Sequence, residues 1–292
     1  MSAIKPSVAK RIAKRSAGRT PKIGRISPSV DFDRELASLF DLSGRVALLP
    51  GGYGGIGEAI AWGLAQRGAD VVVAGRSKSK AEALAGRICA AGYKAHGIAM
   101  DAASVPALEG AVDTVVGRLG AVDILVNCVG MQIEQPIGKV TEGAFDQVVA
   151  INLKAAMFLA QAVARHQIAA GRGGKQMHLL SVRSHLGLRD RGYSAYCSSK
   201  GGLVMLVKQH AMELAKHRIN VNGIAPTFVY TEMIRHVMDN DAFRAQLLAR
   251  IPLGRIADPK DIVGAALFFA APASDFVTGQ ILYVDGGITA SQ

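Results

Sequence analysis

Short apolar runs alternate with segments of helical periodicity along most of the chain. The apolar runs are rich in β-branched residues, as in DVVVA at 70–74, and such runs are typical of buried parallel strands. The intervening segments repeat apolar residues every three or four positions, which predicts amphipathic helices. Strands are predicted at 45–49, 70–74, 94–100, 124–127, 177–181, 218–224 and 279–284. Helices are predicted at 57–67, 80–91, 105–119, 145–170 and 195–216.

This alternation predicts an α/β fold. Strand–helix–strand units are right-handed and parallel, so helices cover both faces of the sheet. We expect a single doubly wound Rossmann-type domain over 31–292, with a seven-stranded parallel sheet, because no repeat or interior linker interrupts the pattern. Its ligands should bind at the carboxyl ends of the strands. Residues 31–40 predict a short amphipathic helix leading into the domain, and 230–252 predict either a helical lid or ordinary packing helices.

The first thirty residues have a different composition. The chain carries a net charge of +11, and residues 1–30 hold eight Lys and Arg and no Asp or Glu, which leaves +3 for the remainder. We expect a disordered tail. It is either a flexible extension of a cytoplasmic protein or a transit peptide that directs the protein to an organellar matrix. Because the charge belongs to the tail, it does not indicate nucleic-acid binding by the domain.

Other compositional features exclude several functional classes. Aromatic residues are few, with Trp62 the single tryptophan, so a stacking surface for single-stranded nucleic acid is not expected. No apolar run reaches the roughly 18 residues that a membrane span needs. The three cysteines are scattered without metal-ligand spacing, which predicts a reduced intracellular protein with no metal site. They are Cys89, Cys128 and Cys197.

A glycine-rich segment, PGGYGGIG at 50–57, joins the first predicted strand to a helix. Glycines in this position allow a tight turn, close approach of the backbone to a pyrophosphate and tight packing of the helix on the sheet. The helix N-terminus adds N–H groups and partial positive charge. The strand–loop–helix context therefore predicts a dinucleotide site. Its expected cofactor-binding residues are Gly51, Tyr53, Gly54, Gly55, Ile56 and Gly57.

The end of the second predicted strand bears on the choice of cofactor. Gly75 stands where NAD-binding sites place a carboxylate for the ribose 2′-hydroxyl, and Arg76 and Ser77 follow it. A guanidinium suits a 2′-phosphate, so NADP(H) is favoured over NAD(H), although Arg76 also fits a solvated residue over the adenine. Asp101 and Ala102, past the third strand, are expected at the adenine edge. Asp101 is alternatively a helix cap.

Tyr196 and Lys200 lie one helical turn apart on one face of the helix predicted at 195–216. A cation within about 4–6 Å typically lowers the pKa of an acid by 1–3 units. We therefore expect Lys200 to bring the phenol of Tyr196 toward working pH, so that Tyr196 takes a proton from an alcohol or gives one to a carbonyl. Ser181, at the end of the fifth predicted strand, would polarise the substrate oxygen.

These motifs together resemble the short-chain dehydrogenase/reductase family. The resemblance rests on the glycine loop, Asn-Cys-Val-Gly at 127–130, Tyr-Cys-Ser-Ser-Lys at 196–200 and Val-Asp-Gly-Gly at 284–287, and it extends over 42–289. The runs FDLSG at 40–44, AVARH at 162–166 and GMQ at 130–132 are similar to the gluconate 5-dehydrogenase subgroup. Four positions depart from the family pattern, namely Pro50 for Thr, Cys128-Val129 for Asn-Ala and Thr227 for Gly.

The resemblance implies further roles. Asn152 would hold a water that links Lys200 to solvent, although an asparagine there also fits a cap or kink in a long helix. Lys200 would hold the nicotinamide ribose, and Thr231 would contact the carboxamide or the phosphates. The remaining cofactor contacts implied are Asn127, Val129, Gly130, Tyr196, Pro226, Thr227 and Val229. Family members are usually tetramers, which implies a homotetramer here.

Two features near the catalytic pair leave alternatives open. The interval to Tyr196 is fifteen positions from Ser181 and twelve from Ser184, whereas the family usually has thirteen. We prefer Ser181, because a strand end is fixed while the loop after it can absorb an insertion. The segment 182–195 is basic, which predicts either an anionic substrate such as a sugar acid or merely a solvated loop. Arg183 and Gln132 are the expected substrate contacts.

The sequence thus predicts an NAD(P)-dependent oxidoreductase that interconverts a secondary alcohol and a ketone of a small molecule, by resemblance a sugar acid. A 3-oxoacyl-(acyl carrier protein) reductase or another carbonyl reductase is the alternative within the family. A regulatory protein that binds the nucleotide without catalysis is the alternative of another class, and the intact Tyr196, Lys200, Ser181 and Asn152 argue against it.

Overall fold

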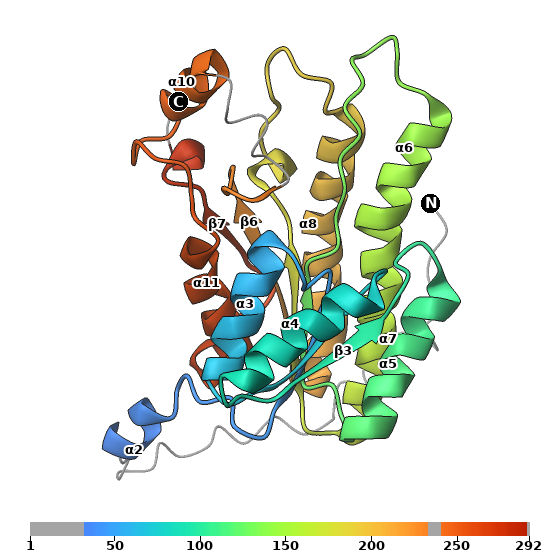
Figure 1. Cartoon of the computed structure of the whole chain (residues 1–292), viewed down its shortest axis with the longest axis vertical. Coiled ribbons are helices and arrows are strands. Elements are labelled where there is room, and N and C mark those ends of the chain that lie inside the picture. Colours follow the sequence, from blue (N-terminus) through green and yellow to red (C-terminus); the bar gives the residue numbers. More distant parts are fainter. Residues whose placement is uncertain (1–31, 233–240, 291–292) are drawn as a thin grey trace, which may run out of the picture. The chain divides into compact units, whose positions relative to one another are not determined.

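The structure, a computed structural model, describes residues 32–232 and 241–290 (Figure 1). The chain divides into two units, Met1–Ala37 and Ser38–Gln292. The described part of the first unit is the helix α2 (Phe32–Ala37), within the helix predicted at 31–40. The expected disordered tail at 1–30 lies outside the described residues. So does the central part of the expected lid, 233–240, which includes Met233, Ile234 and Met238.

The second unit is built on one parallel sheet, which confirms the predicted fold class. Its seven strands lie in the order β3-β2-β1-β4-β5-β6-β7, and every neighbouring pair is parallel. The strand order reverses direction between β1 and β4, and ligands of doubly wound sheets bind at that point. The strands are β1 (Val46–Pro50), β2 (Asp70–Gly75), β3 (Ala95–Ala99), β4 (Ile124–Asn127), β5 (Gly174–Leu179), β6 (Ile219–Pro226) and β7 (Ile281–Val284).

Helices cover both faces of the sheet (Figure 1). One apolar cluster joins the sheet to α3, α4 and α11, and two more join its other face to α5, α7 and α8. Because both faces are covered, β1 and β4 are buried along their whole length, which explains their unbroken apolar sequences. The helices are α3 (Gly55–Gln66), α4 (Lys78–Ala90), α5 (Val105–Leu119), α6 (Glu142–Val149), α7 (Ala155–Ala170), α8 (Ser194–Leu214), α10 (Asp241–Leu248) and α11 (Lys260–Ala270).

The helix predicted at 145–170 differs from expectation in its interior. It begins at Glu142, and a π-helical turn, η1 (Ala150–Lys154), separates α6 from α7. Such a turn adds one residue without ending the helix, and π turns often occur at functional sites. The stretch 142–170 is long and apolar enough to cross a membrane by length and composition alone. Half of its most apolar window is buried in the protein, so it serves as a core helix.

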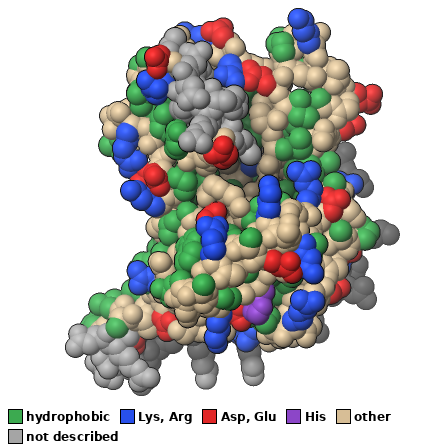
Figure 2. Space-filling model, in the orientation of Figure 1, with side chains coloured by type: hydrophobic (Ala, Val, Ile, Leu, Met, Phe, Trp, Pro, Cys, Tyr) green, Lys and Arg blue, Asp and Glu red, His purple; other side chains and the backbone are tan. Residues whose placement is uncertain are grey.

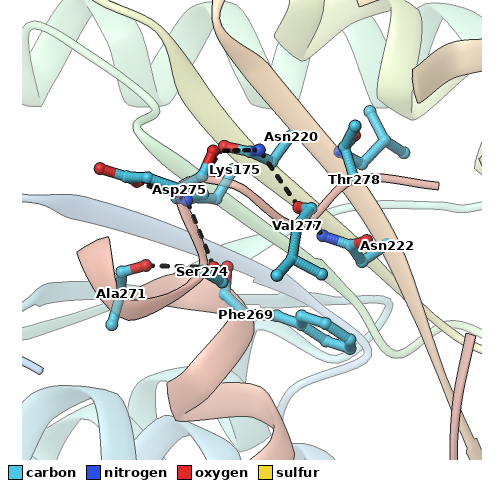
Figure 3. Close-up of polar contacts among 10 residues, drawn as sticks. Lys175, Asn220, Asn222, Phe269, Ala271, Ser274, Asp275, Val277 and Thr278 are labelled. Atoms are coloured by element: carbon cyan, nitrogen blue, oxygen red, sulfur yellow. Dashed lines mark hydrogen bonds and ion pairs between the residues drawn. The ribbon is translucent and has the colours of Figure 1, made fainter. Parts of the chain in front are cut away.

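Polar side chains join the amino-terminal ends of β5 and β6 to the loop before β7 (Figure 3). The Lys175 ammonium donates to Asn220 Oδ1 at 3.0 Å and pairs with Asp275 Oδ1 at 2.7 Å. The amide of Asn222 donates to the carbonyl of Val277 at 2.9 Å. The pKa of Lys175 is lowered because the ammonium is partly desolvated. This network fixes the amino-terminal edge of the sheet. The ligand site is expected at the opposite edge, at the carboxyl ends of the strands.

Charged side chains of both signs are interspersed over the face of the molecule that Figure 2 displays. Several form ion pairs between neighbouring helices, as Arg165 does with Glu109 at 2.8 Å and Arg87 with Glu58 at 2.7 Å. Isolated surface pairs of this kind contribute little to stability. The distribution agrees with the small net charge that the sequence assigns to residues 31–292.

Candidate active site

The glycine loop is held between two strands at the point where the strand order reverses. Gly51 donates its N–H to the Ala74 carbonyl of β2 at 2.8 Å, and Cys128 after β4 donates to the Pro50 carbonyl at 2.9 Å. Gly51 has φ +74°, and a Cβ on it would lie 2.9 Å from the Cys128 backbone. A Cβ on Gly57 would lie 2.7 Å from the Gly51 carbonyl oxygen. Both positions therefore require glycine, as a tight strand–loop–helix turn demands.

The N-terminus of α3 opens directly from this loop. Gly54 occupies the N-cap position and offers no side-chain cap, and a Cβ there would meet open space. The side chain of Thr231, from the segment after β6, lies against Gly55. Uncapped N–H groups and the positive end of the helix dipole favour an anion at this point. The residues present therefore fit the pyrophosphate of a dinucleotide.

Tyr53 lies over the end of β2. Its ring covers Gly75 so closely that a Cβ on Gly75 would collide with it, and its hydroxyl accepts the Ser77 N–H at 3.4 Å. Ser77 also caps α4 by accepting from Lys80 at 3.3 Å. Arg76 is exposed beside them and has no ion-pair partner in the described part of the chain. A cation is thus available where the ribose phosphate of NADP would lie.

Asp101 is exposed past β3, as expected for a residue at the adenine edge. Its Oδ1 accepts the N–H of Ala103 at 3.0 Å. It does not cap the next helix, because Ser104 is the N-cap of α5 and accepts from Ala107 at 3.3 Å. The alternative interpretation of Asp101 as a helix cap is therefore wrong. Ala102 follows it at the same strand end.

Tyr196 and Lys200 lie one turn apart near the start of α8, and Ser181 faces them from the segment after β5. Ser181 was predicted to end the strand, but the strand ends at Leu179, so Ser181 lies two residues beyond it and begins a short 3₁₀ turn. The Ser181 hydroxyl hydrogen-bonds the Tyr196 phenol and accepts the Arg183 N–H at 3.1 Å. Ser184 instead donates to the Ser181 carbonyl at 2.7 Å. The geometry therefore brings Ser181, and not Ser184, to the phenol.

Asn152 lies in the π turn and faces the start of the segment after β4. Its Oδ1 accepts the Met131 N–H at 2.8 Å, and its Nδ2 donates to the Met131 carbonyl at 2.9 Å and to Ser199 Oγ at 3.0 Å. A Cβ on Gly130 would lie 3.5 Å from Lys200 Nζ and 3.7 Å from Asn152 Oδ1. Asn152 therefore fixes the loop beside Lys200 with respect to α8.

The electrostatics of the pair differ from the sequence-based expectation. Burial raises the pKa of Tyr196 to about 12, although the hydrogen bond from Ser181 opposes this shift. Lys200 is 3% exposed, and its Nζ donates to the Leu179 carbonyl at 2.7 Å and lies 5.7 Å from the centre of the Tyr196 ring. Burial lowers the pKa of Lys200 to about 8. The expected lowering of the phenol pKa by Lys200 does not appear in this structure, because desolvation is the largest cause of the shift and Lys200 is not among the charges that act on the phenol.

Several other expected site residues follow the carboxyl ends of β4 and β6. Asn127 Oδ1 accepts the Val129 N–H at 3.1 Å. Pro226 ends β6, Thr227 follows it, and Val229 forms a parallel bridge with Ala257. The Thr227 hydroxyl and both amide atoms of Gln132 are buried without hydrogen-bond partners in the described structure. Buried polar groups are normally paired, so these atoms are suited to a bound ligand.

The basic loop between Ser181 and Tyr196 is partly neutralised by a residue that the sequence did not single out. Glu134, after β4, forms a two-pronged ion pair with Arg191, which lowers the pKa of Glu134. Arg189 is exposed, whereas Arg183 is 5% exposed. Glu134 is forty-seven residues before Ser181 in the chain, so no local pattern could have indicated this contact.

The comparisons with known proteins agree with this geometry. A family model described as enoyl-(acyl carrier protein) reductase matches residues 52–289. The chain belongs to the short-chain dehydrogenase/reductase family. The 5-keto-D-gluconate 5-reductase of Escherichia coli K12 is 36% identical to it over 250 residues, which cover 86% of this chain and 97% of the relative. The gluconate 5-dehydrogenase of Gluconobacter oxydans 621H is 38% identical over 253 residues, which cover 87% and 98%.

Solved structures of the short-chain dehydrogenase/reductase family match the fold as well. A gluconate 5-dehydrogenase from Burkholderia cenocepacia J2315, in complex with NADP and tartrate, superposes with a TM-score of 0.84 at 38% identity. The match covers 88% of this chain and 100% of that structure. The predicted family and subgroup resemblance is thereby confirmed, and the chain is an oxidoreductase of the family's NAD(P)-dependent type.

Proposed function

We propose that this protein is an NADP(H)-dependent oxidoreductase that interconverts a secondary alcohol and a ketone of a sugar acid, as a gluconate 5-dehydrogenase does. The observation that carries the proposal is the convergence of Ser181, Tyr196, Lys200 and Asn152 beside an uncapped glycine loop. The sugar-acid activities of the relatives at 36% and 38% identity support the sugar-acid substrate.

The residues present fit NADP. The glycine loop and the start of α3 would hold the pyrophosphate, Arg76 and Ser77 the 2′-phosphate, and Thr227 and Thr231 the nicotinamide end. When bound, the oxidised cofactor supplies a hydride acceptor. Three solved relatives contain NADP, which supports this choice over NAD. Among the described residues, Arg76 has no ion-pair partner and the Thr227 hydroxyl has no hydrogen-bond partner, so both are available to a bound cofactor.

The chain's own residues would move the proton. In the oxidative direction, the Tyr196 phenolate accepts the proton of the substrate hydroxyl, and Ser181 donates a hydrogen bond to the substrate oxygen. Burial raises the pKa of the phenol to about 12 and so disfavours the phenolate, and the hydrogen bond from Ser181 and the charge of Arg183 offset part of this shift. The ammonium of Lys200 stabilises the phenolate as it forms. Asn152 keeps the adjoining loop and α8 in the register that this geometry requires.

We also propose that the protein is a homotetramer. Large apolar side chains are exposed along helices on one face of the sheet, which a subunit contact would cover. On α8 these are Met205 at 62% exposure and Met212 at 66%. A molecular mass of about four times 30.6 kDa in sedimentation equilibrium would support the tetramer. A mass of one chain across micromolar concentrations would contradict it.

Hydride transfer tests the proposed function directly. Absorbance of NADPH and NADH is followed with a panel of keto acids that includes 5-ketogluconate, and in reverse with gluconate and related hydroxy acids. We expect turnover with NADP(H) and a loss of about 10²–10⁴-fold in kcat for Tyr196→Phe, the usual contribution of a positioned acid or base. Nucleotide binding without turnover would instead identify a regulatory protein, and turnover that is unchanged in Tyr196→Phe would contradict the role of Tyr196 as acid or base.

A further inference from the structure

Arg183 is a buried cation beside the reaction centre with no acidic partner. Its side chain is 5% exposed, and one guanidinium nitrogen, Nη1, donates to the carbonyls of Leu186 at 3.3 Å and Gly187. The structure gives no partner to Nε or Nη2. Within the described residues Arg183 forms no ion pair with a carboxylate. Buried charges in proteins are normally paired, so this environment favours the binding of an anion.

The guanidinium is fixed with respect to the catalytic groups. The backbone N–H of Arg183 donates to Ser181 Oγ at 3.1 Å, so the two residues share one turn. The positive charge of Arg183 acts to lower the pKa of the Tyr196 phenol, against the rise that burial causes. Its charge also acts on Tyr193 and Cys197 on the neighbouring turn of α8. Arg183 therefore borders the space into which the reacting carbon must come.

A second arginine approaches Arg183 from a distant part of the chain. Arg250 follows α10, and its charge lowers the pKa of Arg183, next in size to the effect of burial. An apolar cluster fixes this approach independently, because Leu247 and Ile251 on either side of Arg250 pack with Leu186 of the Arg183 loop. Two like charges held together repel each other unless an anion lies between them.

The other basic residues of the loop do not share this arrangement. Arg191 is already bound to Glu134, and Arg189 and His185 are exposed. The basic loop thus contributes one side chain, Arg183, to the reaction centre, and the segment after α10 contributes Arg250. Of the two interpretations that the sequence left open, the anion site applies to Arg183, and the solvated loop applies to Arg189 and His185.

We propose that Arg183 and Arg250 together bind the carboxylate of the substrate and make the enzyme select acids over neutral polyols. This inference rests on the proposed sugar-acid function and adds the residues that set its specificity. Arg183 presents the free edge of a planar guanidinium, which matches a carboxylate in two-pronged geometry. The exposed Arg250 adds a second positive charge near it. With the carboxylate bound there, the reacting carbon is directed toward Tyr196 and Ser181.

Specificity constants for an acid and its neutral counterpart test the proposal. Gluconate and sorbitol are compared as substrates with NADP⁺ in the wild type, Arg183→Gln, Arg183→Lys, Arg250→Gln and the exposed-loop control Arg189→Gln. We expect kcat/KM for gluconate to fall about 100-fold in Arg183→Gln and about 10-fold in Arg250→Gln, with little change for sorbitol. Arg183→Lys should recover part of the loss, and Arg189→Gln should match the wild type. An unchanged ratio of acid to neutral substrate in Arg183→Gln would overturn the proposal.

Binding measured without turnover separates this inference from the proposed function. Calorimetry of gluconate with the NADPH complex, which cannot react, should show a Kd about 100-fold higher in Arg183→Gln than in the wild type. Because Arg250 is exposed, Arg250→Gln keeps the test valid if Arg183→Gln fails to fold. If the two arginines do not bind the carboxylate, the wild type will bind gluconate and the arginine variants will bind it equally well. Failure of the proposed function would appear in the wild type, which would bind no gluconate, and would overturn both.

Discussion

The buried charge of Lys200 destabilises the folded protein, so replacing Lys200 should raise the free energy of unfolding. Burial lowers its pKa from 10.5 to about 8, and a difference of that size corresponds to about 3 kcal/mol against the charged form at neutral pH. Lys200→Met removes the charge but leaves the Leu179 carbonyl without its 2.7 Å partner, which costs about 1–2 kcal/mol. We expect the variant without cofactor to be about 1–2 kcal/mol more stable than the wild type at pH 7 and catalytically inactive.

The pH dependence of this difference is the sharper test. Between pH 8 and 10.5 the unfolded chain keeps the Lys200 proton and the folded protein loses it, so the wild type gains stability as pH rises. The advantage of Lys200→Met should therefore be constant below pH 8, vanish at about pH 9 and reverse by about pH 10.5, where only the lost hydrogen bond remains. Urea unfolding at pH 7, 8, 9 and 10 measures it, with Lys208→Met, an exposed lysine of the same helix, as control. A variant less stable than the wild type at pH 7, or a difference independent of pH, would refute the reasoning.

Two further predictions concern the choice of serine and the choice of cofactor. Ser181→Ala should lower kcat about 10²–10³-fold through loss of the donor to the substrate oxygen, whereas Ser184→Ala should cost about 1 kcal/mol of stability and little activity. Equal losses of kcat in both would contradict the assignment. Arg76→Gln should raise KM for NADP⁺ about 10–100-fold and leave KM for NAD⁺ unchanged, as steady-state kinetics with each cofactor would reveal. A parallel rise for both cofactors would mean that Arg76 does not bind the 2′-phosphate.

The regular part of the fold was predictable from the sequence because both faces of the sheet are covered. Unbroken apolar runs such as 124–127 then mark strands directly, and the predicted helix at 105–119 matches α5 residue for residue. That helix also carries its own signals, since Ser104 caps its start and Gly120, with φ +80°, ends it. Local signals and tertiary packing agree in such segments.

The π turn at Ala150–Lys154 was not predictable in the same way. Its sequence, Ala-Ile-Asn-Leu-Lys, fits an ordinary helix, and one extra residue shifts the periodicity too little to detect over a single turn. The turn becomes visible only when Asn152 is seen binding Met131 and Ser199. Tertiary hydrogen bonds, and not propensity, define it.

The electrostatics of the site were the least predictable. Spacing placed Tyr196 and Lys200 on one face of a helix, but it could not show that both are desolvated or that Lys200 is engaged by Leu179. The neighbours of Arg183 are similarly hidden, because Arg250 comes from a segment about seventy residues away in the chain. Residue identity indicates which groups take part in the chemistry, whereas burial and distant neighbours set their charge.

The ring of Tyr53 over Gly75 also limits how the cofactor preference can evolve. A carboxylate for an NAD ribose would have to enter at position 75, where any side chain meets that ring. Substitution of Gly75 alone would therefore disturb the glycine loop through Tyr53 and would not yet bind the ribose. A route toward NAD must begin at Tyr53, with a smaller residue that is neutral for the present cofactor. The preference is thus kept by the order in which two mutations must occur, as well as by the affinity of Arg76 for a phosphate.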